Sequence, residues 1–439
     1  MGTNEQYPRV LMVLMTKVKA EDPGNLLIRA QFGDWPKDRL AQIHATGDPK
    51  GQGEFCGHYY RLQTCDRFLG SLFRRLRNRV SEMVAEDPVS GQAKARPAGL
   101  LGRWAKAIKK RLGDWLIGSG VWEVIFHVRL SKPMAEFVKE FKPDLIYCQG
   151  YSLGFATLPL LIARRFALPI CFQTTDDWPR NTYRQSPVGW IVRGRARKLI
   201  KCSSVRLAFG EKMRHAYQRR YGVPFETTYH LDDLGRFPAC AARNNNSHVT
   251  ILYVGGLGHR RYEAIEDLNA AVTGLSGRLG QIRIKVLCGS IPQEMPRDLL
   301  RAAGVEFGPL PSHGDLPGVL VGATVLFLAE SFTESPAAIE YSISTKAHLY
   351  MESGRPLLVY GPACSGTIAY AASEGWGVVV KKRDPALLVT GLEKTLGDAA
   401  IVKACWERAD ACLKRNHDLQ AGRARILDLL SAAVAHSSA

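Results

Sequence analysis

The sequence lacks the features that mark a secreted, membrane-spanning or disulfide-built protein. Its ten cysteines are scattered over 439 residues without a CxxC pair, so we expect reduced thiols rather than disulfides or a zinc site. The opening segment, MGTNEQYPRV, has no cleavable secretory signal, and the longest apolar stretches fall short of the ~20 residues that a transmembrane helix needs. No internal repeat or low-complexity tract is present. These absences predict a soluble, cytoplasmic protein.

Acidic residues are scarce relative to basic ones. The chain has 59 Lys and Arg against 41 Asp and Glu, which gives a net charge of +18. Residues 71–111 hold eleven Lys and Arg against three acids, and residues 180–220 hold twelve against one. Such patches attract nucleic acid, anionic lipid headgroups or phosphorylated substrates, and charge alone does not choose among them.

Short apolar segments alternate with longer amphipathic ones along the chain. This alternation is typical of an α/β protein built on a doubly wound parallel sheet. The expected strands cover residues 9–15, 144–149, 169–173, 205–209, 249–254, 282–287, 325–328, 356–360 and 377–380. The clearest expected helices cover residues 262–279, 345–352 and 385–396, and one or two more are expected over 403–435.

A polar, Asn-rich stretch at residues 233–248 separates two such patterns. We therefore predict a first domain over residues 1–235, a second over 236–415, and a C-terminal helix over 416–439 that packs back on the first domain. Ligands of such sheets bind at the carboxyl ends of the strands, so two domains that face each other form a cleft.

The glycine-rich segment YVGGLGHRR, residues 253–261, follows an expected strand and precedes an expected helix. Gly255 and Gly256 would let the backbone approach a bulky anion, and the helix N-terminus favours negative charge. Arg260 and Arg261 add two cations suited to phosphate. The spacing matches neither the Walker motif nor the dinucleotide fingerprint. The segment predicts a phosphate site, and a simple tight turn is the alternative.

A second candidate lies in the segment SISTKAHLYMESGRP, residues 342–356. Ser344 or Thr345 is a natural N-cap, and Gly354 ends the expected helix. Lys346 then falls in the first helical turn, where a cation is unfavourable unless an anion lies nearby. A lysine in solvent at a helix end is the alternative interpretation.

Several segments together resemble one known family. STKAHLYMESGRPLLVYGP, the preceding VLFLAE and ESPAAIEYSI, VTILYVGGLG and IKVLCGSIP resemble the C-terminal domain of bacterial group 1, or family 4-like, glycosyltransferases. FKPDLIYCQGYSLGFATLPLLIARRFALPICFQTTDDWP resembles their acceptor domain. The resemblance implies a GT-B fold of two Rossmann-like domains, with the donor nucleotide in the second. It also implies retaining transfer with no metal and no cofactor besides the nucleotide-sugar substrate.

By this resemblance, Arg260 or Arg261 binds the donor diphosphate together with Lys346, helped by Ser344 and Thr345. Cations fixed at this place would stabilise the departing nucleoside diphosphate, which makes Arg261 and Lys346 catalytic candidates.

The sequence departs from the family pattern at the ribose. Many members carry two glutamates eight positions apart, and the matching positions here hold Tyr341 and Leu349. Glu334 and Glu340 are close but out of register. Glu340 is therefore only a candidate donor-binding residue, and a solvated carboxylate is the alternative.

In the N-terminal half, the segment TTDDWP, residues 174–179, follows an expected strand. Asp176 or Asp177 is a candidate base or a group that orients an acceptor hydroxyl. Trp178 suits a cleft wall, and Asn25 is expected in the first loop beside the bound sugars. We count Trp178 and Asn25 as acceptor-binding candidates. An Asx turn that caps the next helix is the alternative for the paired acids.

The segment LGRWAKAIKKRLGDWL, residues 101–116, predicts a basic amphipathic helix that either lies on a membrane surface or packs on the domain. We therefore predict a glycosyltransferase that moves a sugar from a nucleotide sugar to an envelope polysaccharide or lipid-linked acceptor, with a peripheral position on the inner face of the cytoplasmic membrane as an extension. A nucleotide-sugar 2-epimerase is an alternative. A nucleic-acid-binding protein is disfavoured, because no RNA-binding signature or aromatic-interleaved basic stripe is present.

Overall fold

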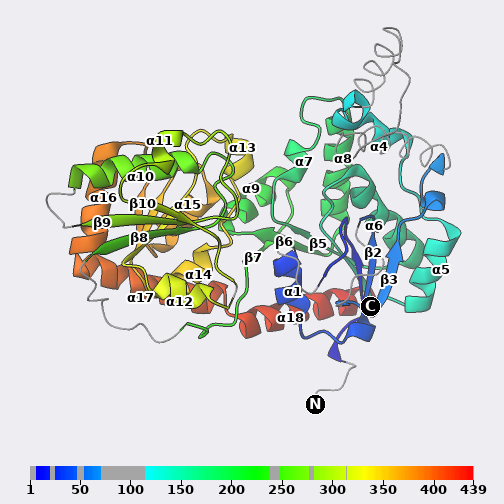
Figure 1. The fold of residues 1–439 in the computed structure, drawn as a ribbon. Helices are drawn as coiled ribbons and strands as arrows, with labels where there is room; N and C mark the ends of the chain where they lie inside the picture. Colours follow the sequence, from blue (N-terminus) through cyan, green and yellow to red (C-terminus); the bar gives the residue numbers. More distant parts are fainter. Residues whose placement is uncertain are drawn as a thin grey trace, which may run out of the picture.

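A computed structural model describes residues 6–19, 25–46, 54–70, 114–237, 248–275, 281–312 and 314–438. These residues form two α/β lobes that lie side by side (Figure 1). The first lobe contains a seven-stranded sheet and the second a six-stranded sheet, and the strands of both sheets pair in parallel. The predicted α/β fold with two doubly wound parallel sheets is confirmed.

The first sheet has the strand order β3-β2-β1-β4-β5-β6-β7. Its central strands are buried along their whole length because helices cover both faces, which explains their continuous apolar runs. The strands are β1 (Val10–Val13), β2 (Leu40–His44), β3 (His58–Arg61), β4 (Leu145–Cys148), β5 (Ile170–Thr174), β6 (Val205–Phe209) and β7 (Glu226–Thr228). The helices are α1 (Leu26–Phe32), α4 (Val121–Ile125), α5 (Lys132–Phe141), α6 (Leu153–Phe166), α7 (Trp178–Asn181), α8 (Val188–Cys202) and α9 (Glu211–Tyr221).

The second sheet has the order β10-β9-β8-β11-β12-β13. Its strands are β8 (Val249–Val254), β9 (Ile282–Leu287), β10 (Val305–Gly308), β11 (Val325–Ala329), β12 (Leu357–Tyr360) and β13 (Val378–Val380). The helices are α10 (Tyr262–Leu275), α11 (Arg297–Leu300), α12 (Leu316–Val321), α13 (Pro336–Ile339), α14 (Ala347–Glu352), α15 (Gly366–Glu374), α16 (Pro385–Gly397), α17 (Ala399–Asn416) and α18 (Leu419–Ser438). Among the described residues, no helix is both long and apolar enough to cross a membrane.

All nine strands expected from the sequence are present, but four others were missed. Of these, β3, β7 and β10 lie at sheet edges, where short and polar strands are tolerated. The missed strand β2, with the sequence LAQIH, is buried but carries two polar residues. The expected cap of α14 was also wrong by one or two residues, because Lys346 itself occupies the N-cap position.

Each sheet reverses its strand order at one place. The reversal lies between β1 and β4 in the first lobe and between β8 and β11 in the second. In doubly wound folds, the loops that leave the two strands at this reversal diverge and open a crevice for ligands. The loops that follow β1, β4, β8 and β11 are therefore the first places to search for a site.

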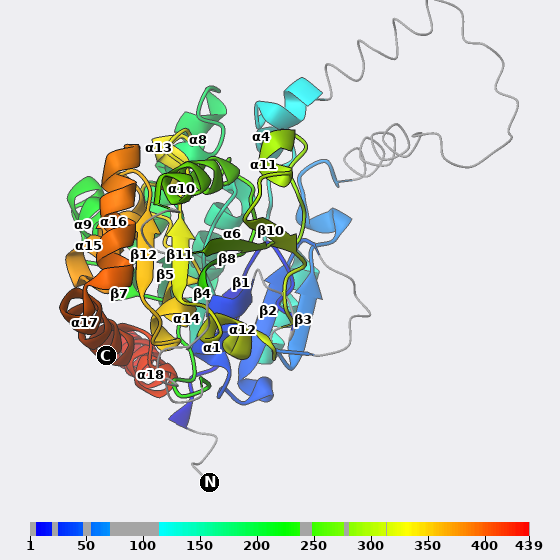
Figure 2. The same ribbon diagram turned by 60° about the vertical axis from the view of Figure 1, so that its left-hand side comes forward.

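The chain passes between the lobes twice, and the two connecting segments meet at one point. Asp232 lies in the segment that leads from the first lobe to the second, and Asp418 lies in the segment that leads back. The two residues pair through an isolated parallel bridge. The backbone N–H of Asp232 donates to the carbonyl of His417 at 2.8 Å. Beyond this point α18 packs on the first lobe, where Ile426 and Leu430 join the same buried cluster as β1 (Figure 2). Residues 238–247, part of the expected linker, lie outside the described residues.

Three histidines surround this meeting point. A ring nitrogen of His417, Nδ1, lies 2.7 Å from the carbonyl oxygen of His230, and its other nitrogen lies 2.8 Å from the hydroxyl of Tyr370. The ring of His348 stacks on that of His417 at 5.6 Å and pairs with Asp232 at 3.1 Å. Burial, and then the neighbouring His348, lower the pKa of both His230 and His417 to about 3. Both rings are therefore neutral in the folded protein at neutral pH.

We expect these histidines to make the folded state sensitive to acid. Their pKa lies below the unfolded value, so their contribution to stability is complete above pH ~6.5 and is lost progressively as the pH falls towards about 3. Between about pH 7.5 and 5.5 each should lower the free energy of unfolding by about 1.4 kcal/mol. Urea unfolding at both pH values measures this, and His417→Gln should remove about half of the loss. The exposed His436→Gln is the control, and an unchanged pH dependence in His417→Gln would contradict the assignment.

Candidate functional site at the facing strand ends

The loop after β8 brings its backbone against a lysine. Gly255 has φ 134°, a conformation that residues with a side chain rarely adopt, and a Cβ there would lie 2.7 Å from Nζ of Lys346. His259 and Arg260 lie further along the same loop and have φ 55° and 56°, in the left-handed region. Such conformations cost about 1–3 kcal/mol each and concentrate at ligand sites. The glycine-rich segment thus combines a glycine-dependent approach to Lys346 with two left-handed residues.

Lys346 is held in a cationic, poorly hydrated position. Its ammonium group lies 4.4 Å from the centre of the Tyr253 ring and 3.4 Å from the phenol oxygen. Burial, together with the nearby charge of Arg261, lowers the pKa of Lys346 to about 8, and the Glu330 carboxylate opposes this shift. Two like charges close together disfavour each other unless an anion joins them. A negatively charged ligand at this place would stabilise the ammonium form of Lys346.

Glu330 connects Arg261 to the start of α14. Nε and Nη2 of Arg261 both donate to Oε2 of Glu330, at 3.0 and 2.9 Å, and the carboxylate is almost fully buried. The hydroxyl of Thr367 donates to the other oxygen at 2.9 Å and accepts the backbone N–H of Ser344 at 2.9 Å. The sequence analysis did not nominate Glu330 or Thr367. Glu330 immediately follows the apolar strand β11, and this position in the sequence could have predicted it as a site residue.

Other predicted donor residues lie around this network. Arg260 is 60% exposed and its guanidinium pairs with Glu263 on α10 at 2.7 Å. Glu340 lies 3.8 Å from Arg180 of the first lobe, at the end of α13. The carbonyl of Gly256 accepts a hydrogen bond from the Tyr253 hydroxyl at 2.7 Å. Of the predicted donor set, the structure thus gathers Gly255, Arg261, Ser344 and Lys346 most closely.

A cavity of about 410 Å³ lies where the lobes face each other. Its walls come from the loops after β1, β4, β5 and β7, from the end of β6, from the start of α1, and from the segment that precedes α14. The predicted residues Asn25, Asp176 and Thr345 all line it. The full lining is Leu14, Met15, Thr16, Asn25, Leu26, Leu27, Ile28, Gln149, Gly150, Tyr151, Thr175, Asp176, Phe209, His230, Ser342, Ile343 and Thr345.

Tyr151 orients one wall of this cavity. It has φ 67°, next to Gly150 with φ 89°, and a Cβ at Gly150 would lie 2.3 Å from the Trp178 ring. The Tyr151 hydroxyl is 2.5 Å from Oγ1 of Thr175 and donates to Oδ2 of Asp176 at 3.3 Å. Tyr151 therefore fixes the direction of the Asp176 carboxylate. Nothing in the sequence GYS marks a strained tyrosine, so Tyr151 is not predictable from the sequence alone.

Asp177 and Trp178, in contrast to Asp176, are buried and contact other side chains of the protein. Both oxygens of Asp177 accept hydrogen bonds from Arg220, at 2.6 and 2.9 Å, and Tyr217 donates to one of them at 3.0 Å. Removing one partner of a buried ion pair typically destabilises a protein by about 3–5 kcal/mol. Trp178 is buried beneath Gly150, and neither residue lines the cavity. Of the three predicted residues, the structure places Asp176 at the cavity wall, and it places Asp177 and Trp178 in the protein interior beside the loop.

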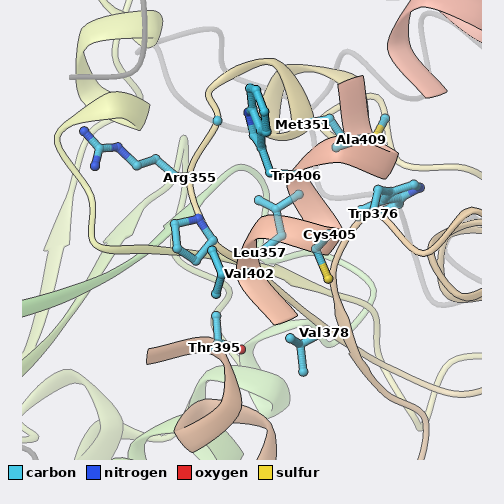
Figure 3. Close-up of a pocket in the computed structure, with 12 residues that line it drawn as sticks. Met351, Arg355, Leu357, Trp376, Val378, Thr395, Val402, Cys405, Trp406 and Ala409 are labelled. Atoms are coloured by element: carbon cyan, nitrogen blue, oxygen red, sulfur yellow. The ribbon is translucent and has the colours of Figure 1, made fainter. Parts of the chain in front are cut away.

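A smaller hollow in the second lobe does not qualify as a site. It has a volume of about 20 Å³, room for about one water molecule. Figure 3 shows mainly apolar side chains around it, with Arg355 pointing away from the others. Within the part of the chain that the structure describes, no group of three or more His, Cys, Asp or Glu side chains could hold a metal ion.

No model of a known protein family matches this chain, and no curated protein matches its sequence. Solved structures do match over nearly the whole chain. A trehalose 6-phosphate synthase from Burkholderia multivorans is 13% identical with a TM-score of 0.59, and 98% of each chain is covered.

Two further solved structures give the same result. A sucrose-phosphate synthase from Thermosynechococcus elongatus is 14% identical with a TM-score of 0.60, covering 98% of this chain and 100% of the other. HepE from Anabaena, solved in complex with UDP-glucose, is 13% identical with a TM-score of 0.56, covering 96% and 99%. This likeness, with the two doubly wound parallel sheets, shows that the chain has the GT-B fold.

Gly255→Ala should damage the loop after β8. The new methyl group would adopt an unfavourable φ and press on Lys346, so we expect a loss of about 1–3 kcal/mol in the free energy of unfolding. Chemical denaturation measures the loss. Gly258→Ala is the matched control, because a Cβ there meets no atom within 4 Å. Equal stability of the two variants would show that the close approach of Gly255 and Lys346 is unimportant.

Proposed function

We propose that this protein is a glycosyltransferase whose second lobe binds the diphosphate of a nucleotide sugar. The observation that carries the proposal is the ammonium of Lys346, held beside the backbone of Gly255 and the guanidinium of Arg261 at the point where the strand order reverses. Support also comes from the solved structures with this fold, which include two sugar-phosphate synthases and a complex with UDP-glucose.

The proposed reaction transfers a sugar between two oxygens. The bond between C1 of the sugar and the diphosphate oxygen breaks, and a bond between C1 and an acceptor hydroxyl oxygen forms. The nucleoside diphosphate leaves with the electron pair of the broken bond, and the hydroxyl proton passes to the Asp176 carboxylate or to an oxygen of the departing diphosphate. Lys346 and Arg261 would stabilise the negative charge that develops on the leaving group. Glu330 would keep Arg261 in place, and the backbone at Ser344 and Thr345 would complete the diphosphate site.

The first lobe supplies the acceptor side in this proposal. Asp176 faces the cavity with a carboxylate that Tyr151 orients, so it is placed to bind or deprotonate an acceptor hydroxyl. Asn25 lines the same cavity. We propose retention of configuration at C1, on the resemblance to group 1 glycosyltransferases, and an envelope polysaccharide or lipid-linked glycan as the acceptor.

Lys346→Ala should weaken nucleoside diphosphate binding at least about tenfold, because a hydrogen bond to a charged group contributes about 1.5–3 kcal/mol. Titration calorimetry with UDP, GDP, ADP and the corresponding glucose and mannose nucleotides measures this. In the wild-type protein the affinity should fall as the pH rises through about 8, where Lys346 loses its charge, and Lys346→Ala should lack this dependence. Exposed Lys394→Ala is the control.

Three results would count against this assignment. Absence of binding across the panel would remove the donor site, and equal affinity of the variant would remove Lys346 from it. Turnover of a nucleotide sugar without any acceptor would favour the 2-epimerase.

We also propose that the first lobe meets an anionic membrane surface through α8. Trp190 on this helix is 77% exposed and Ile191 is 46% exposed, and the guanidinium of Arg193 lies 5.5 Å from the Trp190 ring. Residues 178–210 contain eight Lys and Arg and no acid. Exposed aromatic and aliphatic side chains surrounded by cations are typical of protein surfaces that bind the headgroup region of an anionic bilayer.

A second helix adds to this surface. Ile125 on α4 is 42% exposed, and both ribbon views place α4 and α8 at the same end of the lobe (Figures 1 and 2). The two regions are joined where Tyr183 donates a hydrogen bond to Glu123 at 2.6 Å. Most of the basic helix expected at residues 101–116 lies outside the described residues. We therefore rest the membrane proposal on α8 and α4, with the protein at the cytoplasmic face of the membrane.

The double variant Trp190→Ala/Ile191→Ala should lose binding to vesicles. We expect the wild-type protein to float with vesicles that contain phosphatidylglycerol and not with pure phosphatidylcholine, and the variant to stay in solution. Trp406→Ala, which removes a Trp that is 49% exposed on α17, is the matched control. Equal flotation of both variants would contradict the proposal that α8 binds the membrane. Salt-sensitive binding of duplex DNA without vesicle binding would favour the nucleic-acid interpretation.

A further inference from the structure

The cavity between the lobes contains little positive charge. Lys and Arg account for 59 of the 439 residues, yet none is among the described residues that line the cavity. The lining includes one carboxylate, Asp176, and one imidazole, His230. The electrostatic character of this cavity is thus opposite to that of the chain as a whole.

Neither Asp176 nor His230 offers a positive charge to an anion in the cavity. Asp176 is exposed at the cavity wall and contributes a negative charge that repels a phosphate. Burial and the neighbouring His348 lower the pKa of His230 to about 3, so this ring carries no positive charge at neutral pH. The groups that face His230 are the rings of Phe209 and His348, and its carbonyl accepts from His417. No Lys or Arg side chain in the described lining could pair with a phosphate group.

The rest of the lining suits a polyhydroxylated, uncharged ligand. Neutral hydrogen-bonding side chains come from several strand ends and from the second lobe, namely Thr16, Asn25, Gln149, Thr175 and Thr345. Tyr151 and Phe209 add flat apolar surfaces, which can pack against the C–H faces of a sugar ring. A volume of about 410 Å³ is within the usual range for small-molecule sites.

Phosphate-binding charge is instead placed on the other side of Thr345. Lys346 follows Thr345 directly and approaches Gly255, while Arg261 reaches the same region through Glu330. Neither Lys346 nor Arg261 lines the cavity. The site is therefore divided into a cationic part in the second lobe and a neutral-to-acidic part in the first.

We infer that the cavity is an acceptor subsite for an uncharged sugar unit and that it discriminates against sugar phosphates. This inference rests on the proposed glycosyltransferase function. The inference limits the substrates of the cavity to sugar units that carry no phosphate group. An acceptor with a phosphate elsewhere must keep that phosphate outside the cavity.

Competing neutral and phosphorylated sugars test the inference. The full-length protein is saturated with the nucleoside diphosphate that binds most tightly in calorimetry. Saturation-transfer NMR then compares glucose, mannose, fructose and N-acetylglucosamine with their 6-phosphates. We expect at least one neutral sugar to bind about tenfold more tightly than its phosphate. A sugar phosphate that binds as tightly as its neutral partner, or the absence of binding by all neutral sugars, would overturn the inference.

A charge added to the cavity wall provides a gain-of-binding test. Leu26 lines the cavity and is 41% exposed, so Leu26→Lys should preserve the fold and raise sugar-phosphate affinity about fivefold, the effect of one nearby cation in water. Leu387→Lys, on α16 and 44% exposed, is the matched control. No gain from Leu26→Lys would show that charge does not set the selectivity. Failure of diphosphate binding contradicts the proposed function, whereas intact diphosphate binding with a preference for sugar phosphates contradicts only this inference.

Discussion

The candidate site depends on one close approach, between the ammonium group of Lys346 and the backbone at Gly255. This contact requires a residue without a side chain at the end of β8, and it requires α14 to begin where β8 ends. Arg261 could not lie beside the same ammonium without Glu330, which binds the guanidinium and reaches Ser344 through Thr367. Three segments that are distant in sequence thus hold two cations and one buried carboxylate together at the end of β8.

The loops that form the two halves of the site share a physical principle although their chemistry differs. In each lobe the strand order reverses once, and the loops at this reversal contain residues in left-handed conformations: Tyr151 in the first lobe, His259 and Arg260 in the second. Strained backbone persists only where surrounding contacts impose it. For Tyr151 these contacts are the Trp178 ring beneath Gly150 and the hydrogen bonds to Thr175 and Asp176.

Much of the fold could be read from the sequence, because buried parallel strands appear as continuous apolar runs. Nine strands and the helices after Arg261 and after Lys346 were predictable in this way. The edge strands β3, β7 and β10 were not, since they are short and polar, and neither was the buried strand β2, which carries two polar residues. At the site, the residues with a local signature, such as Gly255, Arg261 and Lys346, were recognisable. Glu330, Thr367 and Tyr151 were not, because their importance comes from partners far away in the chain. The ion pair of Asp177 was unpredictable for the same reason, since its partner Arg220 is 43 residues away.

The bridge between Asp232 and Asp418 has a consequence for how the two lobes are connected. Both segments that link the lobes meet at this bridge, so these connections converge at one point. Because α18 packs on the first lobe beyond the bridge, β1 and α18 belong to the same buried cluster although they lie at opposite ends of the described chain. His348, on α14 and two residues from Lys346, stacks on His417 at this point. The candidate diphosphate site of the second lobe is therefore linked through a short stretch of α14 to the junction with the first lobe.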